Sequence, residues 1–62
     1  MKLQDWQKEQ NLSDVQLAEL LDIDRTYIYR LNKGERRASP YLALKIEQLT
    51  QGKVSRIEVL YP

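Results

Sequence analysis

The chain has no cysteine and no histidine, and it has only two glycines and two prolines among its 62 residues. Without cysteine, neither disulfide bonds nor thiolate–metal sites can brace the fold. Without histidine, the commonest general base and the commonest nitrogen ligand of zinc are both missing. We therefore expect a protein that acts by binding, with no cofactor, no metal site and no catalytic residues, rather than an enzyme.

Long apolar runs are missing as well. No stretch approaches the roughly 20 apolar residues of a membrane span, and the N-terminus lacks the apolar core of a signal peptide. Hydrophobic residues make up 42% and charged residues 31% of the chain, which is typical of a globular rather than a disordered protein. We expect one soluble, cytoplasmic domain over residues 1–62, without a membrane or a small-molecule substrate among its partners.

The formal net charge of +1 conceals an uneven distribution of charge. Residues 1–23 carry two basic and five acidic side chains, whereas residues 24–40 carry five basic and two acidic ones. Half of the ten basic residues therefore lie in 17 consecutive positions. Such a segment is a candidate footprint for a polyanion, and a solvated basic helix face is the alternative.

Apolar spacing and capping residues predict four helices and therefore an all-α fold. The first covers about residues 2–10, with Trp6 in the core and Asn11 as a left-handed terminator. The second begins at Ser13, which forms a capping box with Gln16. Its apolar face comprises Leu17, Leu20 and Leu21, with Ala18 beside them.

The third predicted helix follows a turn of three residues, 22–24. Asp24 has the chemistry of its N-cap, and Gly34 is expected to end it after about Lys33. The spacing of Ile28 and Leu31 predicts that these two side chains face inward.

The fourth predicted helix begins at Ser39, with Pro40 at the first helical position, where a missing N–H costs nothing. Gly52 ends it, and its buried face is expected to be Leu42, Ile46 and Leu49.

The tail, residues 53–62, is ambiguous in sequence. Its β-branched and aromatic residues permit a short strand. Ser55 and Glu58, however, match a capping box, and Val54 and Val59 are spaced for a hydrophobic staple. We favour a short helical turn.

Two helices joined by a three-residue turn, the second of them basic, describe a helix-turn-helix. Residues 12–36 resemble the Cro/repressor-type helix-turn-helix of phage and bacterial transcription regulators, and with its flanking helices the resemblance covers residues 1 to about 50. It rests on Leu17-Ala18, Leu21, Ile23, Asp24, Ile28, Leu31 and Gly34 in register. The resemblance implies a compact lambda-repressor-like domain that binds double-stranded operator DNA. The small size suits a Cro-like phage or prophage repressor that occludes a promoter.

The chain departs from the family pattern at three places. Asp22 stands where glycine is frequent in the turn, so a residue with a Cβ must adopt a left-handed conformation. Asp14 stands where a glutamine often helps to hold a phosphate, a part that Gln16 could take instead. Gln7 and Asn32 occupy the positions of a frequent arginine–glutamate pair, which predicts a neutral amide contact.

The outward face of the third helix holds the candidate base readers. The resemblance places them at Arg25, Thr26 and Arg30. Tyr29 is a further outward candidate, expected at the groove wall, with packing on the protein as the alternative. Arginine can bind guanine O6 and N7, and threonine can bond a base edge or touch a thymine methyl. Phosphate contact is the alternative for both arginines.

The candidate contacts to the sugar-phosphate backbone surround that face. Cations and the free N–H groups of a helix N-terminus both hold anions well. Two alternatives stay open, namely packing of the Tyr27 ring between helices and pairing of Arg36 or Arg37 with Glu35. The candidates are Gln16, Tyr27, Asn32, Lys33, Arg36, Arg37 and Ser39.

A domain of this size reads few base pairs, so we expect a homodimer, weak in solution or completed on DNA. The alternative function is a protein-interaction module, an antitoxin or adaptor. The tail could instead fold back to complete a thin core. The candidate dimer surface is Val54, Ile57, Val59, Leu60 and Tyr61.

Overall fold

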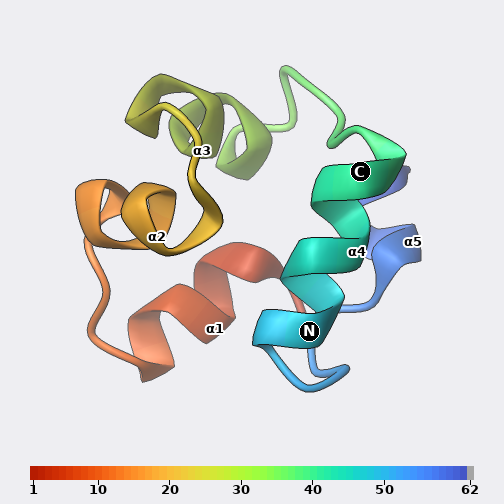
Figure 1. The fold of residues 1–62 in the computed structure, drawn as a ribbon, viewed down its shortest axis with the longest axis horizontal. Coiled ribbons are helices and arrows are strands. Elements are labelled where there is room, and N and C mark those ends of the chain that lie inside the picture. Colours follow the sequence, from red (N-terminus) through yellow and green to blue (C-terminus); the bar gives the residue numbers. More distant parts are fainter. Residues whose placement is uncertain (62) are drawn as a thin grey trace.

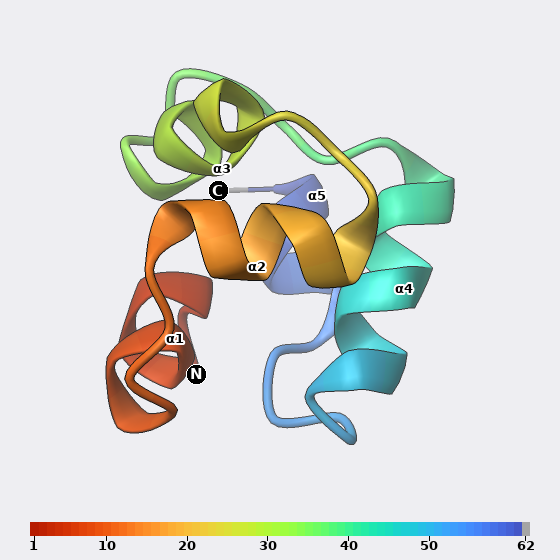
Figure 2. The same cartoon turned by 60° about the vertical axis from the view of Figure 1, so that its left-hand side comes forward.

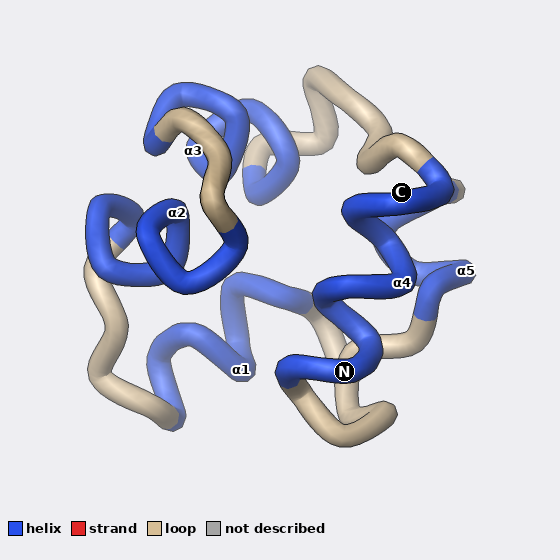
Figure 3. Tube along the Cα trace, in the orientation of Figure 1, coloured by secondary structure: helices blue, strands red, loops and turns tan. Residues whose placement is uncertain are grey.

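The computed structural model describes residues 1–61, and this part of the chain contains five α-helices and no strand (Figures 1 and 3). Residue 62, the last of the predicted tail, lies outside the described residues. No helix in residues 1–61 is long and apolar enough to cross a membrane. The helices are α1 (Leu3–Glu9), α2 (Asp14–Leu21), α3 (Arg25–Asn32), α4 (Pro40–Leu49) and α5 (Arg56–Leu60).

Helix α2 lies between α1 and α3, as the views in Figures 1 and 2 both show. It packs against α3 and α4, while α5 packs against α4. The whole assembly measures 22 × 22 × 18 Å. Helix α3 therefore lies at the edge of the molecule, with one side on the core and the other free.

The core draws on every part of the chain. Leu17, Leu21, Ile28, Ile46 and Val54 are the largest fully buried side chains. The predicted inward positions in α3 are confirmed, as is the core position of the single tryptophan.

Local capping follows the sequence closely in α2. The Ser13 hydroxyl accepts a hydrogen bond from the backbone N–H of Gln16, and the Gln16 side chain accepts one from the Ser13 N–H. The capping box is therefore confirmed. Asn11 and Asp22 adopt left-handed φ values of 55° and 56°, as predicted for both positions.

The apolar face of α2 is narrower than predicted. Leu20 is 55% exposed, so its assignment to the buried face is wrong. The buried face is centred on Leu17, Ala18 and Leu21, and the 3.6-residue period of the helix puts Leu20 to one side of it. In α4, Leu49 is only half-buried.

The tail forms a helix, α5, which confirms the favoured helical turn and excludes the strand. The predicted capping box is wrong, because the Ser55 side chain makes no cap hydrogen bond. The Glu47 carboxylate accepts from the Arg56 N–H instead, at 3.1 Å, and pairs with the Arg56 guanidinium at 3.2 Å. Glu58 instead pairs with the N-terminal ammonium of Met1 at 2.7 Å.

The packing of α5 corrects part of the predicted dimer surface. Val54 and Val59 are buried in the core of the chain itself, and the Val59 carbonyl accepts a 2.9 Å hydrogen bond from the Ala38 N–H. These two valines are therefore not surface residues, and the fold-back alternative is correct for them. Ile57 and Tyr61 remain 68% and 70% exposed, with Leu60 half-buried.

Candidate nucleic-acid interface

Helix α3 presents one exposed polar face. Arg25, Thr26, Tyr29 and Arg30 are all exposed, while Ile28 and Leu31 on the opposite side are buried. Each exposed residue is three or four positions from another, so all four share one face. The structure thus brings the four candidate base readers together, and their contact with bases stays a prediction.

The start of α3 is held by its N-cap. The Asp24 carboxylate accepts a 2.9 Å hydrogen bond from the backbone N–H of Thr26, as predicted. Because the cap fixes the first turn, the side chains of Arg25 and Thr26 project from a rigid position.

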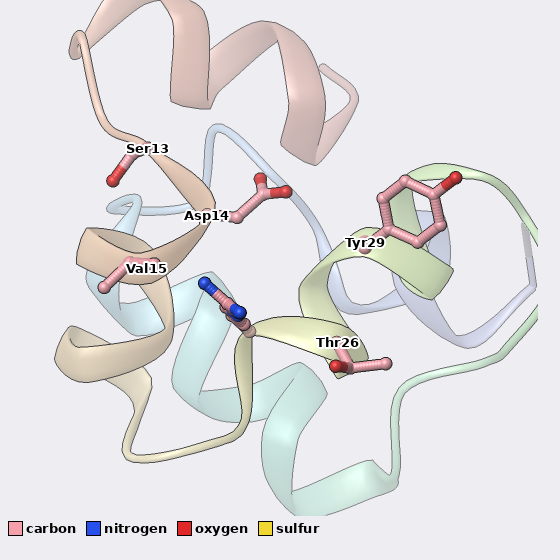
Figure 4. Close-up of a pocket in the computed structure, with 6 residues that line it drawn as sticks. Ser13, Asp14, Val15, Thr26 and Tyr29 are labelled. Carbon is pink, nitrogen blue, oxygen red and sulfur yellow. The ribbon is translucent and has the colours of Figure 1, made fainter.

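An open hollow of about 460 Å³ lies between the beginnings of α2 and α3. Figure 4 shows Asp14 at the start of α2, and Thr26 and Tyr29 on α3. The hollow joins three of the candidate base readers to the N-terminal end of α2. Its lining is Ser13, Asp14, Val15, Arg25, Thr26 and Tyr29.

A buried glutamine, Gln7, connects three helices through hydrogen bonds of its side chain. Gln7 is 6% exposed, and its side-chain oxygen Oε1 accepts a 3.0 Å hydrogen bond from the side-chain amide of Asn32. Its own amide donates a 2.7 Å hydrogen bond to a carboxylate oxygen of Asp14. The predicted neutral contact between Gln7 and Asn32 is confirmed. The inclusion of Asp14 was not predicted, and it ties α1 to the start of α2 and the end of α3.

Tyr27 attaches the loop between α3 and α4, residues 33–39, to α3; we call this loop the basic loop. Its hydroxyl donates to the Arg37 carbonyl and accepts from the Ser39 N–H, both at 3.2 Å. The Arg36 guanidinium lies 4.5 Å from the centre of the same ring. The structure thus engages the Tyr27 hydroxyl within the chain, which favours the packing alternative for this ring over a phosphate contact.

Three other candidate contacts to the DNA sugar-phosphate backbone also make hydrogen bonds within the protein. The side-chain oxygen of Gln16 accepts a hydrogen bond in the capping box, and the side-chain amide of Asn32 donates to the side chain of Gln7. The Ser39 hydroxyl accepts a 3.2 Å hydrogen bond from the Leu42 N–H, which confirms it as the N-cap of α4.

The cations of the basic segment stay accessible. Lys33, Arg36 and Arg37 are exposed, and no ion pair joins either arginine to Glu35 within residues 1–61. The alternative in which Arg36 or Arg37 pairs with Glu35 is therefore wrong for the described part of the chain, and the Arg36 guanidinium lies over the Tyr27 ring instead.

A residue that the sequence did not single out, Lys8, lies near this surface. It lines a second hollow of about 350 Å³, together with Asp14, Tyr29 and Lys33. Only the packing of α1 beside the end of α3 reveals it, since Lys8 belongs to a segment with net negative charge. No group of three potential metal ligands occurs among residues 1–61.

The helix-turn-helix family matches residues 3–58, which include the whole of α1 to α4. Comparisons with curated proteins and with solved structures found no match. The matched region holds the capped pair α2–α3, the three-residue turn and the exposed basic face of α3. The chain therefore belongs to the helix-turn-helix family and is a DNA-binding regulator of the Cro/repressor type.

Proposed function

We propose that the protein is a Cro-like repressor of phage or prophage origin, which binds a palindromic operator as a dimer and occludes a promoter. The observation that carries the proposal is the exposed face of α3, where Arg25, Thr26 and Arg30 lie together. The major groove of B-DNA, about 12 Å wide, accepts an α-helix. Ile28 and Leu31 hold the opposite side of α3 on the core, so the helix can enter the groove without unfolding the domain.

The exposed side chains suit the reading of base edges. Arg25 and Arg30 each carry the planar fork that binds O6 and N7 of a guanine. Thr26 offers a hydroxyl and a methyl group to the base between them. Tyr29 is half-exposed, with the Lys33 ammonium 5.2 Å from its ring centre, and we assign this ring to the wall of the groove.

The loop after α3 supplies affinity without sequence information. Lys33, Arg36 and Arg37 place three positive charges beside α3, and Tyr27 holds the loop that carries the two arginines. Contacts of this kind to phosphates position a protein on the duplex. Each phosphate that is neutralised adds about 0.9 to the dependence of log K on log salt.

A dimer doubles the number of base pairs that the protein contacts, because each copy brings one α3 helix. Two copies on an inverted repeat place their α3 helices roughly 34 Å apart, one turn of DNA. Ile57 on α5 and Tyr61, the residue that follows the helix, are mostly exposed, so they offer apolar surface that a second copy could cover. We assign the dimer contact to these two residues and Leu60.

The experiment that tests the proposal is selection of bound duplexes from a randomised pool at two salt concentrations. We expect enrichment of an inverted repeat with guanine in each half-site, and affinity that falls steeply with salt. Ile57→Ser with Tyr61→Ser should abolish cooperative binding to the repeat while half-site binding persists. Transcription in vitro from a promoter that carries the selected repeat should then fall when the protein is added.

Salt-dependent binding without enrichment would contradict the proposal, since it would reduce the basic segment to an electrostatic patch. The protein-interaction alternative, an antitoxin or adaptor, would then be the better explanation of the exposed α3 face.

A further inference from the structure

Asp14 places a negative charge inside an otherwise cationic surface. It is the first residue of α2 and lines both hollows beside α3. Arg25 lines one of these hollows, and Lys8 and Lys33 line the other. A carboxylate in this place opposes the attraction that the three cations exert on DNA.

The position of the carboxylate is fixed by the fold. Asp14 is half-buried, and the amide of the buried Gln7 holds one of its oxygens at 2.7 Å. Gln7 is itself held by Asn32 at 3.0 Å. The side chain therefore cannot swing away from an approaching duplex without breaking its part-buried hydrogen bond to Gln7.

The charge of Asp14 is not cancelled by an ion pair within the chain. In residues 1–61 the ion pairs are Met1–Glu58 and Glu47–Arg56, and neither includes Asp14. Arg25 shares a hollow with Asp14 but forms no ion pair with it in the described part of the chain, so its guanidinium is available to a base.

The N-terminal end of a helix with free N–H groups is where a phosphate binds most readily. In α2 the carboxylate of Asp14 stands at that end itself. A phosphate placed in either hollow would meet this negative charge at close range, whereas a base edge, which carries no net charge, would not.

Building on the proposed function, we propose that Asp14 is a specificity-determining residue. Its carboxylate keeps DNA phosphates away from the start of α2. It therefore weakens every placement of the protein on DNA in which a phosphate lies at the start of α2. A placement in which Arg25 and Thr26 reach base edges is not weakened, because those contacts involve no phosphate at the start of α2. Specificity thus gains from a repulsive element as well as from attractive contacts.

The test compares two duplexes, the selected inverted repeat and a scrambled duplex of equal length, by fluorescence anisotropy with the full chain. Asp14→Asn removes the charge and keeps an oxygen that can accept from Gln7. Glu19→Gln is the matched control, because it removes the same charge from an exposed position later in α2. Asp14→Glu keeps the charge, Asp14→Ser is a second uncharged variant, and thermal unfolding confirms that each variant folds.

We expect Asp14→Asn and Asp14→Ser to bind the scrambled duplex about three- to tenfold more tightly, with a smaller change on the repeat. The salt dependence on the scrambled duplex should steepen by up to about 0.9 in slope, and Asp14→Glu should behave as the unaltered protein does.

Equal gains from Asp14→Asn and Glu19→Gln would overturn the inference, because net charge alone would explain them. Weaker binding of the repeat by Asp14→Asn, with unchanged binding of the scrambled duplex, would also overturn it. If the unaltered protein fails to prefer the repeat, the proposed function fails, and the inference fails with it.

Discussion

The ammonium group of Lys45 in α4 donates a 2.8 Å hydrogen bond to the carbonyl oxygen of Leu21, the last residue of α2. The final carbonyls of a helix lack intrahelical donors, and a cation is favourable at that end. Helix α4 therefore helps to terminate α2 immediately before the turn that leads into α3.

Lys45→Met should lower the free energy of unfolding by about 1–2 kcal/mol, because it removes a charged hydrogen bond and a cation at a helix C-terminus. Urea unfolding measures the loss. Lys53→Met alters an exposed lysine whose side chain makes no hydrogen bond in the described structure, and its effect should stay within about 0.5 kcal/mol. Equal losses from the two variants would show that the contact with Leu21 adds nothing.

Asp22→Gly should stabilise the protein by about 0.5 kcal/mol, because residue 22 has a φ of 56° and glycine adopts it without a Cβ penalty. Asp22→Ala should have the opposite sign, since alanine keeps the Cβ and loses the local tolerance of aspartate for this conformation. Thermal unfolding of the two variants measures both changes in stability. Destabilisation by Asp22→Gly would show that the left-handed conformation of residue 22 carries no Cβ penalty.

Tyr27→Phe should weaken DNA binding while α3 stays folded. The change removes the hydroxyl that bridges the Arg37 carbonyl and the Ser39 N–H, so the basic loop loses its attachment. We expect about 1 kcal/mol less stability and a several-fold loss of affinity in a binding titration. Tyr41→Phe is the matched control at a residue that is 72% exposed, and it should change neither quantity.

Gln7→Met should cost about 1–3 kcal/mol, because it leaves the polar groups of Asp14 and Asn32 without their partner. Asn32→Ala added to Gln7→Met should cost little more, since the contact that it removes is already lost. Urea unfolding of the single and double variants measures this coupling. Gln4→Met, on an exposed position of α1, is the control, and fully additive losses would argue against a shared network.

Arg25→Ala and Arg30→Ala should each relax the sequence preference at one position of the half-site, at a cost of about 1–3 kcal/mol of discrimination. Arg37→Ala should weaken binding to all sequences alike and reduce the salt slope by about 0.9. Repeating the duplex selection with each variant separates the two classes. A uniform loss from Arg25→Ala and Arg30→Ala would reassign both arginines to phosphates.

The capped starts of α2, α3 and α4, and the inward side of α3, could be predicted from the sequence. Capping by Ser13, Asp24 and Ser39 joins residues two or three positions apart, so it depends on local geometry. The burial of Ile28 and Leu31 likewise follows from helical spacing. Once that side is inward, Arg25, Thr26 and Arg30 must face outward.

Contacts between distant residues could not be predicted in the same way. The cap of α5 comes from Glu47, not from Ser55, and the α2 carboxylate at residue 14 is held by Gln7 in α1. Lys45 reaches Leu21 across 24 positions of sequence. Each polar group had several chemically suitable partners, and only the packing of the helices decided which one lay within hydrogen-bond distance.

The sequence by itself therefore determined helices α1 to α4, the caps of α2, α3 and α4, and the exposed basic face of α3, because these depend on neighbours along the chain. The tertiary structure alone decided that Leu20 is exposed and that Val54 and Val59 belong to the core. It also decided that Asp14 is held by Gln7 and lines the same hollows as Arg25, Lys8 and Lys33. Burial and charge environment depend on which helices meet in space, and this information lies in no single segment of the chain.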